Sequence, residues 1–447
     1  MTAVKKEWLL LFVVALITLA ASLGILRWLA PQLIGLPVDL RLVKTSETLP
    51  PFYEGVFRRA DYTSDDLFVN DPVTVTRGRP RFPELISLGP HDVLGFRNRN
   101  VPVYADIAVI GDSQTYGNNV ALEDNWPSRM MESLGDYQAS TYNMAAGGWG
   151  GVQYLEMATK ATTFLPRLLI VAFYTGNDPL ESFLLAYQLE QFKDLRPAEG
   201  LGPGDMPAVT YPAPPEDLWQ VSFKDGFETI FTPTLRLPAN DDHPVVRAGY
   251  GVMANAAREI RRVTQPFGIA VIFTIIPTKE YVFSEKLRLD GVVPPPVFER
   301  LVAEEGKRIA DFADVLRAVA DADYVDVTAP LVDAAIKGIP IYPSNVNGHP
   351  IEGGYAVIGD ALGAAARAKL LQRPKGFFAV PVRENKAAFF LVSSDGVWRF
   401  PGIDHALNNG WSRDQMQVDS FRAFAGLPRL GILDVVDPER FGPDAVH

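Results

Sequence analysis

The chain has 447 residues, a formal net charge of −11, 47% hydrophobic residues and 21% charged residues. This is the composition of a globular protein, with room for one large domain and appendages. The negative charge argues against a nucleic-acid partner, because phosphate binding requires a basic face. The chain has no cysteine, which excludes disulfides, a thiolate nucleophile and cysteine-ligated zinc. Because it has only five histidines, we expect no metal cluster, and no motif indicates a cofactor.

The first predicted element is the uncharged apolar run from Trp8 to Leu26. Its length is close to the ~20 residues that cross the hydrocarbon core of a bilayer. A cleaved signal peptide is the alternative interpretation, but the run continues past the small residues that could be cleaved. We therefore expect a single transmembrane anchor within residues 1–30. Lys5 and Lys6 precede it, which favours a cytoplasmic amino terminus and a periplasmic or other extracytoplasmic main domain.

The rest of the chain divides by composition into a linker, a main domain and an appendage. Residues 31–100 are rich in Pro, Arg and Asp and are expected to form a linker that packs on the main domain. Residues 101–375 alternate strand-like and helical runs, as βαβ units do. Within them, 181–240 is a Pro- and Gly-rich insertion, either a substrate loop or a solvated excursion. Residues 376–447 are expected to form a small appendage with a β-hairpin and exposed aromatic side chains.

The most informative motif is Ile110–Thr115, of sequence IGDSQT, which includes Ser113. It follows the apolar run Ala105–Val109, which is typical of a buried strand. A serine at a strand-to-helix turn is where α/β folds place a nucleophile, since the turn holds the hydroxyl clear of the sheet. Turns are rich in Gly, Asp and Ser for other reasons, so the motif needs support from elsewhere in the chain.

Three later segments give that support. The first is the glycine-rich Tyr142–Gly151, and the second is Tyr174–Asp178, directly after the buried strand Leu168–Phe173. The third is Asn347–Pro350, just before the helical run Tyr355–Leu371. In an open parallel sheet the carboxyl ends of the strands lie side by side and form the ligand crevice. We therefore expect these segments to meet the serine turn there.

The order of four residues along the chain, Ser113, Gly148, Asn177 and His349, is similar to that in the SGNH or GDSL hydrolase family. The chain resembles this family over about 105–370. The resemblance implies a flavodoxin-like three-layer α/β/α sandwich with a parallel sheet. It also implies that Ser113 is the nucleophile and His349 the general base. The implied oxyanion hole consists of the backbone N–H groups of Ser113 and Gly148 and the side-chain amide of Asn177. Loss of one such donor typically costs ~10²–10³ in rate.

One position departs from the family pattern. Members usually carry Asp two or three residues before the histidine, whereas this chain has Asn347 at the triad-acid position. In a serine-protease triad that change lowers turnover about 10⁴-fold. Three alternatives remain open: a dyad oriented by a backbone carbonyl, another acid such as Glu352 or Asp326, or a degenerate site kept as a scaffold.

Three further polar residues lie near the predicted strand ends. Asp112 and Asp178 are expected to be structural and to bond nearby loop amides. Lys279 either faces the crevice, where it would attract an anionic substrate, or is a solvated loop lysine. The solvated position is favoured, because lysine is mostly exposed.

The resemblance also suggests a function. Membrane-anchored relatives add or remove O-acetyl groups on extracellular polysaccharides such as alginate. We therefore expect a membrane-anchored serine esterase or O-acyltransferase acting on an ester such as an acetylated polysaccharide. The alternative is a catalytically degenerate protein of the same fold that serves as a structural subunit, with other subunits of a membrane complex as partners.

Overall fold

The computed structural model describes residues 67–71, 73–102, 105–134, 139–371, 375–383, 386–393, 396–418 and 429–445. All of them belong to the second of two compact units, Ala60–His447. The anchor predicted within residues 1–30 lies outside the described residues. In the part of the chain that is described, no helix has the length and apolarity to cross a membrane.

A five-stranded parallel sheet forms the centre of the main domain, in the order β4-β3-β5-β8-β9. Its strands are β3 (Ile107–Gly111), β4 (Thr141–Asn143), β5 (Leu168–Tyr174), β8 (Ala270–Ile276) and β9 (Ala322–Asp326). Numbered along the chain, the order is 2-1-3-4-5, which is the flavodoxin-like order. The predicted α/β fold with a parallel sheet is therefore confirmed. In this topology the switch point lies between β3 and β5, where ligands bind at the carboxyl ends of the strands.

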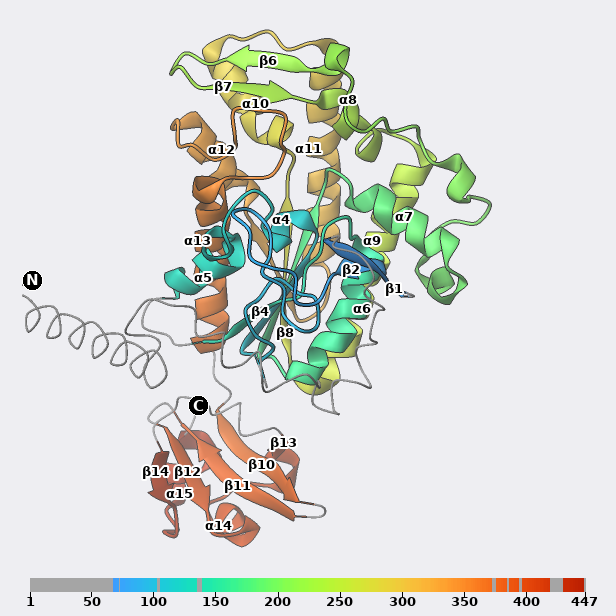
Figure 1. Ribbon diagram of the computed structural model, residues 1–447. Helices are drawn as coiled ribbons and strands as arrows, with labels where there is room; N and C mark the ends of the chain where they lie inside the picture. Colours follow the sequence, from blue (N-terminus) through green and yellow to red (C-terminus); the bar gives the residue numbers. More distant parts are fainter. Residues whose placement is uncertain are drawn as a thin grey trace, which may run out of the picture. The chain divides into compact units, whose positions relative to one another are not determined.

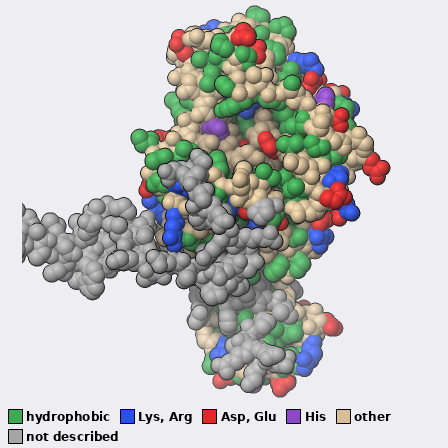
Figure 2. Space-filling model, turned by 45° about the vertical axis from the view of Figure 1, so that its right-hand side comes forward, with side chains coloured by type: hydrophobic (Ala, Val, Ile, Leu, Met, Phe, Trp, Pro, Cys, Tyr) green, Lys and Arg blue, Asp and Glu red, His purple; other side chains and the backbone are tan. Residues whose placement is uncertain are grey.

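Helices cover both faces of this sheet (Figure 1). On one face lie α5 (Trp126–Ser133), α12 (Thr328–Ile336) and α13 (Glu352–Leu371). On the other lie α6 (Gly151–Ala161), α9 (Pro244–Thr264) and α11 (Pro296–Arg317). Acidic and basic side chains are interspersed on the face of the molecule shown in Figure 2.

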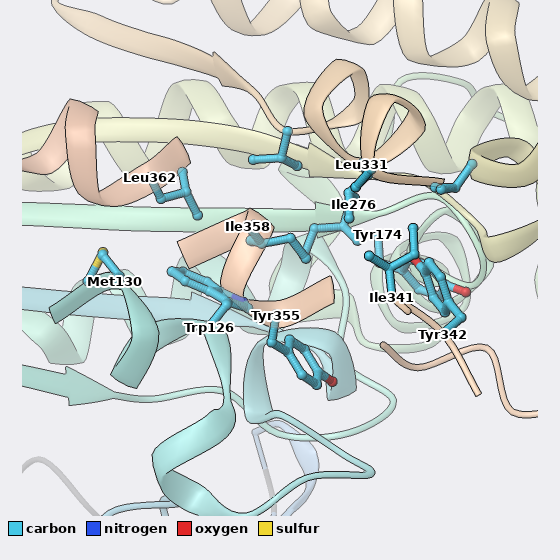
Figure 3. Close-up of a cluster of buried hydrophobic side chains, with 14 of the residues drawn as sticks. Trp126, Met130, Tyr174, Ile276, Leu331, Ile341, Tyr342, Tyr355, Ile358 and Leu362 are labelled. Carbon is cyan, nitrogen blue, oxygen red and sulfur yellow. The ribbon is translucent and has the colours of Figure 1, made fainter. Parts of the chain in front are cut away.

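The central strand β5 explains why the sheet needs two covering layers. All seven of its residues are buried, as expected for a parallel strand with both faces covered. Ile170 belongs to the core shared with α5 and α13, where Trp126 and Met130 lie beside the apolar side chains of α13 (Figure 3). Phe173 points to the opposite face and meets Phe312 of α11 edge-on, with ring centroids 5.1 Å apart.

The described part of 31–100 contains a small hairpin that packs on the main domain. It consists of β1 (Phe68–Asp71) and β2 (Val75–Gly78), paired antiparallel. The indole Nε1 of Trp149 donates to the carbonyl oxygen of Thr76 at 2.8 Å. The hairpin therefore lies against the glycine-rich segment that follows β4.

Arg97 supports the chain directly after the serine turn. Its side chain is fully buried. The guanidinium donates to the carbonyl oxygens of Gly89 at 2.7 Å, Tyr116 at 3.2 Å and Val120 at 2.8 Å, and also to that of Gly117. These carbonyls lie in irregular backbone or, for Tyr116, in the last residue of a short helix, where no ladder bond satisfies them. One buried side chain therefore replaces several missing backbone partners.

Arg97→Met is expected to lower the free energy of unfolding by about 3 kcal/mol or more, because buried carbonyls lose a charged donor. Urea unfolding of the full chain, followed by tryptophan fluorescence, measures this. Arg99→Met is the matched control, since exposed Arg99 pairs with Glu84 and Glu123 on the surface. Such surface pairs contribute about 0–1 kcal/mol. Equal losses in the two variants would contradict the role given to Arg97.

The insertion at 181–240 is a folded part of the main domain. Its regular elements after the end of α7 (Asp178–Gln188) are β6 (Trp219–Ser222), β7 (Glu228–Phe231) and α8 (Pro233–Arg236), besides short 3-10 turns. Val221, Phe223 and Phe231 are buried in the same core as the sheet residues. The interpretation of this segment as a purely solvated excursion is therefore wrong. Arg236, near the end of the segment, lies close to the loop that contains Gly348 and His349.

The carboxy-terminal residues form a second five-stranded sheet, in the order β13-β10-β11-β12-β14. The strands are β10 (Gly376–Arg383), β11 (Lys386–Val392), β12 (Val397–Phe400), β13 (Gln417–Val418) and β14 (Arg429–Ile432), with α14 (Ile403–Asn408) and α15 (Pro438–Phe441). The predicted hairpin is confirmed as β11 and β12. The predicted exposure of the aromatics is wrong for Phe377, Phe400 and Trp411, which are buried with Phe441. The reason is that the following segment folds back over them, and Trp411 Nε1 donates to the Phe441 carbonyl at 2.7 Å.

Candidate active site

Ser113 lies at the turn between β3 and the short helix α4 (Ser113–Tyr116). Asp112 directly precedes the helix and caps it, because its Oδ1 accepts the Gln114 N–H at 2.8 Å. The turn is tight: a Cβ on Gly111 would lie 2.1 Å from Thr115 Oγ1. This geometry presents the half-buried Ser113 hydroxyl at the carboxyl edge of the sheet.

His349 reaches Ser113 from a loop that directly precedes α13. Its Nε2 lies 2.8 Å from Ser113 Oγ, although 236 positions separate the two residues. Gln114 Nε2 donates to the Gly348 carbonyl at 3.4 Å, and Asn119 Nδ2 donates to the Pro350 carbonyl at 3.4 Å. Hydrogen bonds on both sides of the Ser113–His349 contact therefore hold the serine turn against the loop that carries His349. The 2.8 Å between Ser113 Oγ and His349 Nε2 is the distance that a nucleophile and its base require.

Asn347 contacts the other ring nitrogen of His349. Its Oδ1 lies 2.7 Å from His349 Nδ1 and also accepts the His349 backbone N–H at 3.0 Å. A backbone N–H can only donate, so the amide must present its oxygen here. His349 Nδ1 then carries the proton, which leaves Nε2 free to accept from the Ser113 hydroxyl. Asn347 thus selects the tautomer that a general base needs, but it brings no negative charge.

Neither of the alternative acids hydrogen-bonds to His349 in the described part of the chain. Asp326 Oδ1 instead accepts the Thr328 N–H at 2.8 Å, at the start of α12. Glu352 is the first residue of α13. Burial, and then the positive charge of Arg236, lower the pKa of His349 to about 4. The imidazole is therefore neutral at pH 7, and no carboxylate of the described residues hydrogen-bonds to the ring.

Gly148 and Asn177 are the other two residues predicted to supply donors to the oxyanion hole. Gly148 has a φ of +72°, and no atom lies within 4 Å of the position a Cβ would take. The neighbouring Gly147 lies against Ser113, with 3.7 Å between its Cβ position and Ser113 Cβ. Asn177 precedes α7, but its side chain makes no capping bond. Among the described residues, neither the Gly148 N–H nor the Asn177 side chain has a hydrogen-bond partner.

Asp112 and Asp178 are both fully buried beneath the serine turn. Asp178 Oδ2 accepts the Tyr174 N–H at 2.8 Å and the Tyr154 hydroxyl at 2.7 Å. Burial, and then the charge of Asp112, raise the pKa of Asp178 well above its ordinary value. Both carboxylates accept backbone N–H groups and so hold the loops at the ends of β3 and β5. Asp112 Oδ2 also lies 3.3 Å from Ser113 Oγ.

Lys279 is not the solvated loop lysine that the sequence favours. Its side chain is buried at the start of α10 (Lys279–Asp290). The ammonium donates to the carbonyl oxygens of Pro343 at 3.1 Å and Asn345 at 2.6 Å. Burial lowers the pKa of Lys279 to about 8. The residue therefore holds the loop that carries Asn347 and His349, a contact that no local sequence pattern indicates.

Sequence reasoning also missed Arg236 and Tyr174. Arg236 Nη2 lies 2.7 Å from the position that a Cβ on Gly348 would take, beside His349. Tyr174 is the last residue of β5, and its buried hydroxyl has no partner among the described residues. Within the described chain, no group of three or more His, Asp or Glu residues could hold a metal ion.

No family model and no curated protein matches this chain. Similar solved structures include a lipolytic protein of the G-D-S-L family from Desulfitobacterium hafniense, with 11% identity over 58% of this chain and 97% of that one and a TM-score of 0.31. A GDSL-like lipase from Bacteroides thetaiotaomicron has 10% identity, coverages of 59% and 87%, and a TM-score of 0.29. An acetylxylan esterase from Geobacillus stearothermophilus has 11% identity, coverages of 60% and 95%, and a TM-score of 0.32. The first two carry the G-D-S-L name of the family that the four segments resemble.

Proposed function

We propose that this chain is a serine esterase or O-acyltransferase of the SGNH type. The observation that carries the proposal is the chain of contacts from Ser113 Oγ to His349 Nε2, at 2.8 Å, and from His349 Nδ1 to Asn347 Oδ1, at 2.7 Å. A serine, a base and a group that orients the base are the parts that nucleophilic acyl transfer requires.

The reaction uses these parts in order. His349 Nε2 takes the Ser113 proton as Oγ attacks the ester carbonyl, and the negative charge on the carbonyl oxygen is met by the N–H of Gly148 and the amide of Asn177. When the tetrahedral intermediate collapses, His349 gives its proton to the leaving alcohol and the acyl group stays on Ser113. Water then releases the acid in an esterase, whereas an acceptor hydroxyl takes the acyl group in a transferase.

The finer parts of the proposal concern location and substrate. The apolar run Trp8–Leu26 supports a membrane anchor with the main domain outside the cytoplasm. The resemblance to membrane-anchored O-acetylation proteins supports an acetylated polysaccharide as the ester. Retention of the full chain in the membrane fraction after carbonate washing tests the anchor, and recovery of a soluble form that begins near Ser22 would contradict it.

The neutral Asn347 favours a second candidate, a structural subunit of a membrane complex that has lost activity. A histidine with a pKa of about 4 and no carboxylate partner is a weak base. Incubating the full chain with p-nitrophenyl acetate, with and without an oligosaccharide acceptor, separates the candidates. Nitrophenol release that depends on Ser113 supports the esterase, and acetylated oligosaccharide supports the transferase. Inertness in both assays, with stable co-purifying partners, supports the structural subunit.

Asn177→Ala is expected to lower kcat for ester hydrolysis by about 10²–10³-fold, because one oxyanion donor is lost. The free energy of unfolding should change by less than about 0.5 kcal/mol, since the side chain caps nothing. Steady-state kinetics and urea unfolding of the same preparation give both quantities.

Asn125→Ala is the matched control, because Asn125 precedes α5 in the same way but does cap it. Its Oδ1 accepts the Ser128 N–H at 2.9 Å. This variant should lose about 1 kcal/mol of stability and keep its rate. If instead Asn177→Ala lost stability and kept its rate, Asn177 would be a structural cap.

A further inference from the structure

The Arg236 guanidinium has no anionic hydrogen-bond partner among the residues that the structure describes, although it lies beside the site. Its Nη2 is 2.7 Å from the Cβ position of Gly348, next to His349. Across the described ranges its side chain makes no ion pair and no hydrogen bond, and its buried Nε is unpartnered. The guanidinium carbon lies 6.0 Å from the centroid of the Tyr174 ring.

A second unpartnered donor lies at the same place. The Tyr174 side chain is 2% exposed, and its hydroxyl lies 3.7 Å from the same Cβ position of Gly348. No described residue hydrogen-bonds to that hydroxyl, nor to the buried hydroxyl of Tyr342. Figure 3 shows Tyr174 and Tyr342 at the same end of the core cluster. Buried polar groups are ordinarily paired, so two or more unpaired donors beside a reactive centre indicate a place for a ligand.

Neither of the nearby carboxylates, Glu280 and Glu305, hydrogen-bonds to Arg236 among the described residues, and the buried Oε2 of Glu280 has no hydrogen-bond partner there. Glu280 Oε1 accepts the Thr232 N–H at 2.8 Å. Glu305 accepts the Thr278 N–H at 2.8 Å and the Thr175 hydroxyl at 2.6 Å. They influence Arg236 only from a distance. The guanidinium therefore keeps its forked donor face for a group that comes from outside.

The charge balance of the site points the same way. Arg236 disfavours the protonated form of His349, and Asn347 contributes no negative charge against it. An anion on Arg236 would cancel that positive charge when substrate is bound. The site would then gain through its substrate the negative charge that a triad aspartate supplies in other enzymes.

We propose that Arg236 and Tyr174 bind a carboxylate carried by the ester substrate, beside Ser113 and His349. This inference rests on the proposed function in one respect: the anion is part of the ester. A guanidinium pairs with a carboxylate through two parallel N–H donors, and a tyrosine hydroxyl donates a third hydrogen bond. Arg236 and Tyr174 are thus specificity-determining residues, and the protein prefers anionic esters to neutral ones.

Binding is measured first, without turnover. The full chain carrying Ser113→Ala is titrated calorimetrically with monomethyl succinate, which is anionic, and with dimethyl succinate, which is neutral. Adding Arg236→Gln is expected to weaken binding of the anionic ester about 10- to 100-fold, the effect of a lost charge-assisted hydrogen bond, and to leave the neutral ester unchanged. Tyr174→Phe should act in the same direction. Arg300→Gln, which alters an exposed arginine paired with Asp241, should have no effect.

Hydrolysis of p-nitrophenyl acetate and of the p-nitrophenyl monoester of succinate completes the test with Ser113 intact. Arg236→Gln should lower the ratio of kcat/KM for the anionic ester to kcat/KM for the neutral ester about 10- to 100-fold. Equal losses on both esters would show that Arg236 only positions the Gly348 loop, and unchanged binding of monomethyl succinate would also overturn the inference. If binding discriminates while the wild type hydrolyses neither ester, the esterase proposal fails and the anion site stands.

Discussion

Replacing Ser113 with alanine is expected to reduce ester hydrolysis about 10⁴-fold or more, and His349→Ala should cost about as much. The double variant should be no worse than either single one. The reason is that Ser113 Oγ and His349 Nε2, 2.8 Å apart, act as one unit, so removing either disables both. Initial rates with p-nitrophenyl acetate for the two single variants and the double variant measure this.

The control for this series is Ser284→Ala. Ser284 is also partly buried, and its hydroxyl donates to the Tyr281 carbonyl at 2.7 Å in α10, away from the serine turn. Its rate should equal that of the wild type. Losses that multiply in the Ser113 and His349 double variant would mean that the two residues act separately, contrary to the geometry described above.

Asn347→Asp is expected to raise turnover by roughly 10-fold or more, because a correctly placed triad carboxylate can contribute ~10⁴ in rate. The new carboxylate would keep both hydrogen bonds that Oδ1 now accepts from His349. Its charge would also raise the pKa of His349 from about 4. The neutral imidazole is the active base, so wild-type activity should persist down to about pH 4 and fall below it. In the variant this fall should occur at higher pH.

A pH–rate profile for kcat/KM of the wild type and of Asn347→Asp tests both the gain in rate and the direction in which the pKa of His349 shifts. Asn345→Asp is the control, since Asn345 lies on the same loop and its Oδ1 accepts the Asn347 N–H at 2.9 Å without contacting the ring. Adding Ser113→Ala must abolish the gain from Asn347→Asp. If the acidic limb of the pH–rate profile stays at the same pH in Asn347→Asp and turnover does not rise, the missing negative charge at Asn347 does not limit the rate of hydrolysis.

The sequence is sufficient to predict those parts of the fold and site that depend on local patterns. Uninterrupted apolar runs such as Leu168–Phe173 are typical of strands buried on both faces, and the structure has β5 there. Parallel strands end at one edge of the sheet, so turns after consecutive strands must meet. This rule covers Ser113, which follows β3, whereas His349 lies before α13 and was predicted to join Ser113 from the order of segments that resembles the SGNH family.

The other parts depend on contacts between segments that carry no common pattern. Arg97 and Lys279 are of residue types that are mostly exposed, yet both are buried because they satisfy backbone carbonyls. Arg236 reaches the site because 181–240 folds into the core. The aromatics of the carboxy-terminal sheet, such as Phe377, are buried because a later segment covers them. None of these long-range contacts has a period or spacing that could be recognised.

The central claim is that Ser113 is a nucleophile activated by His349. The most direct measurement is labelling of the full chain with a fluorophosphonate at pH 7, followed by peptide mass mapping. We expect one adduct, on Ser113, that is absent from His349→Ala and from Ser113→Ala and is retained in Ser284→Ala. No adduct on Ser113 in the wild type, or equal labelling when His349 is replaced, would contradict it.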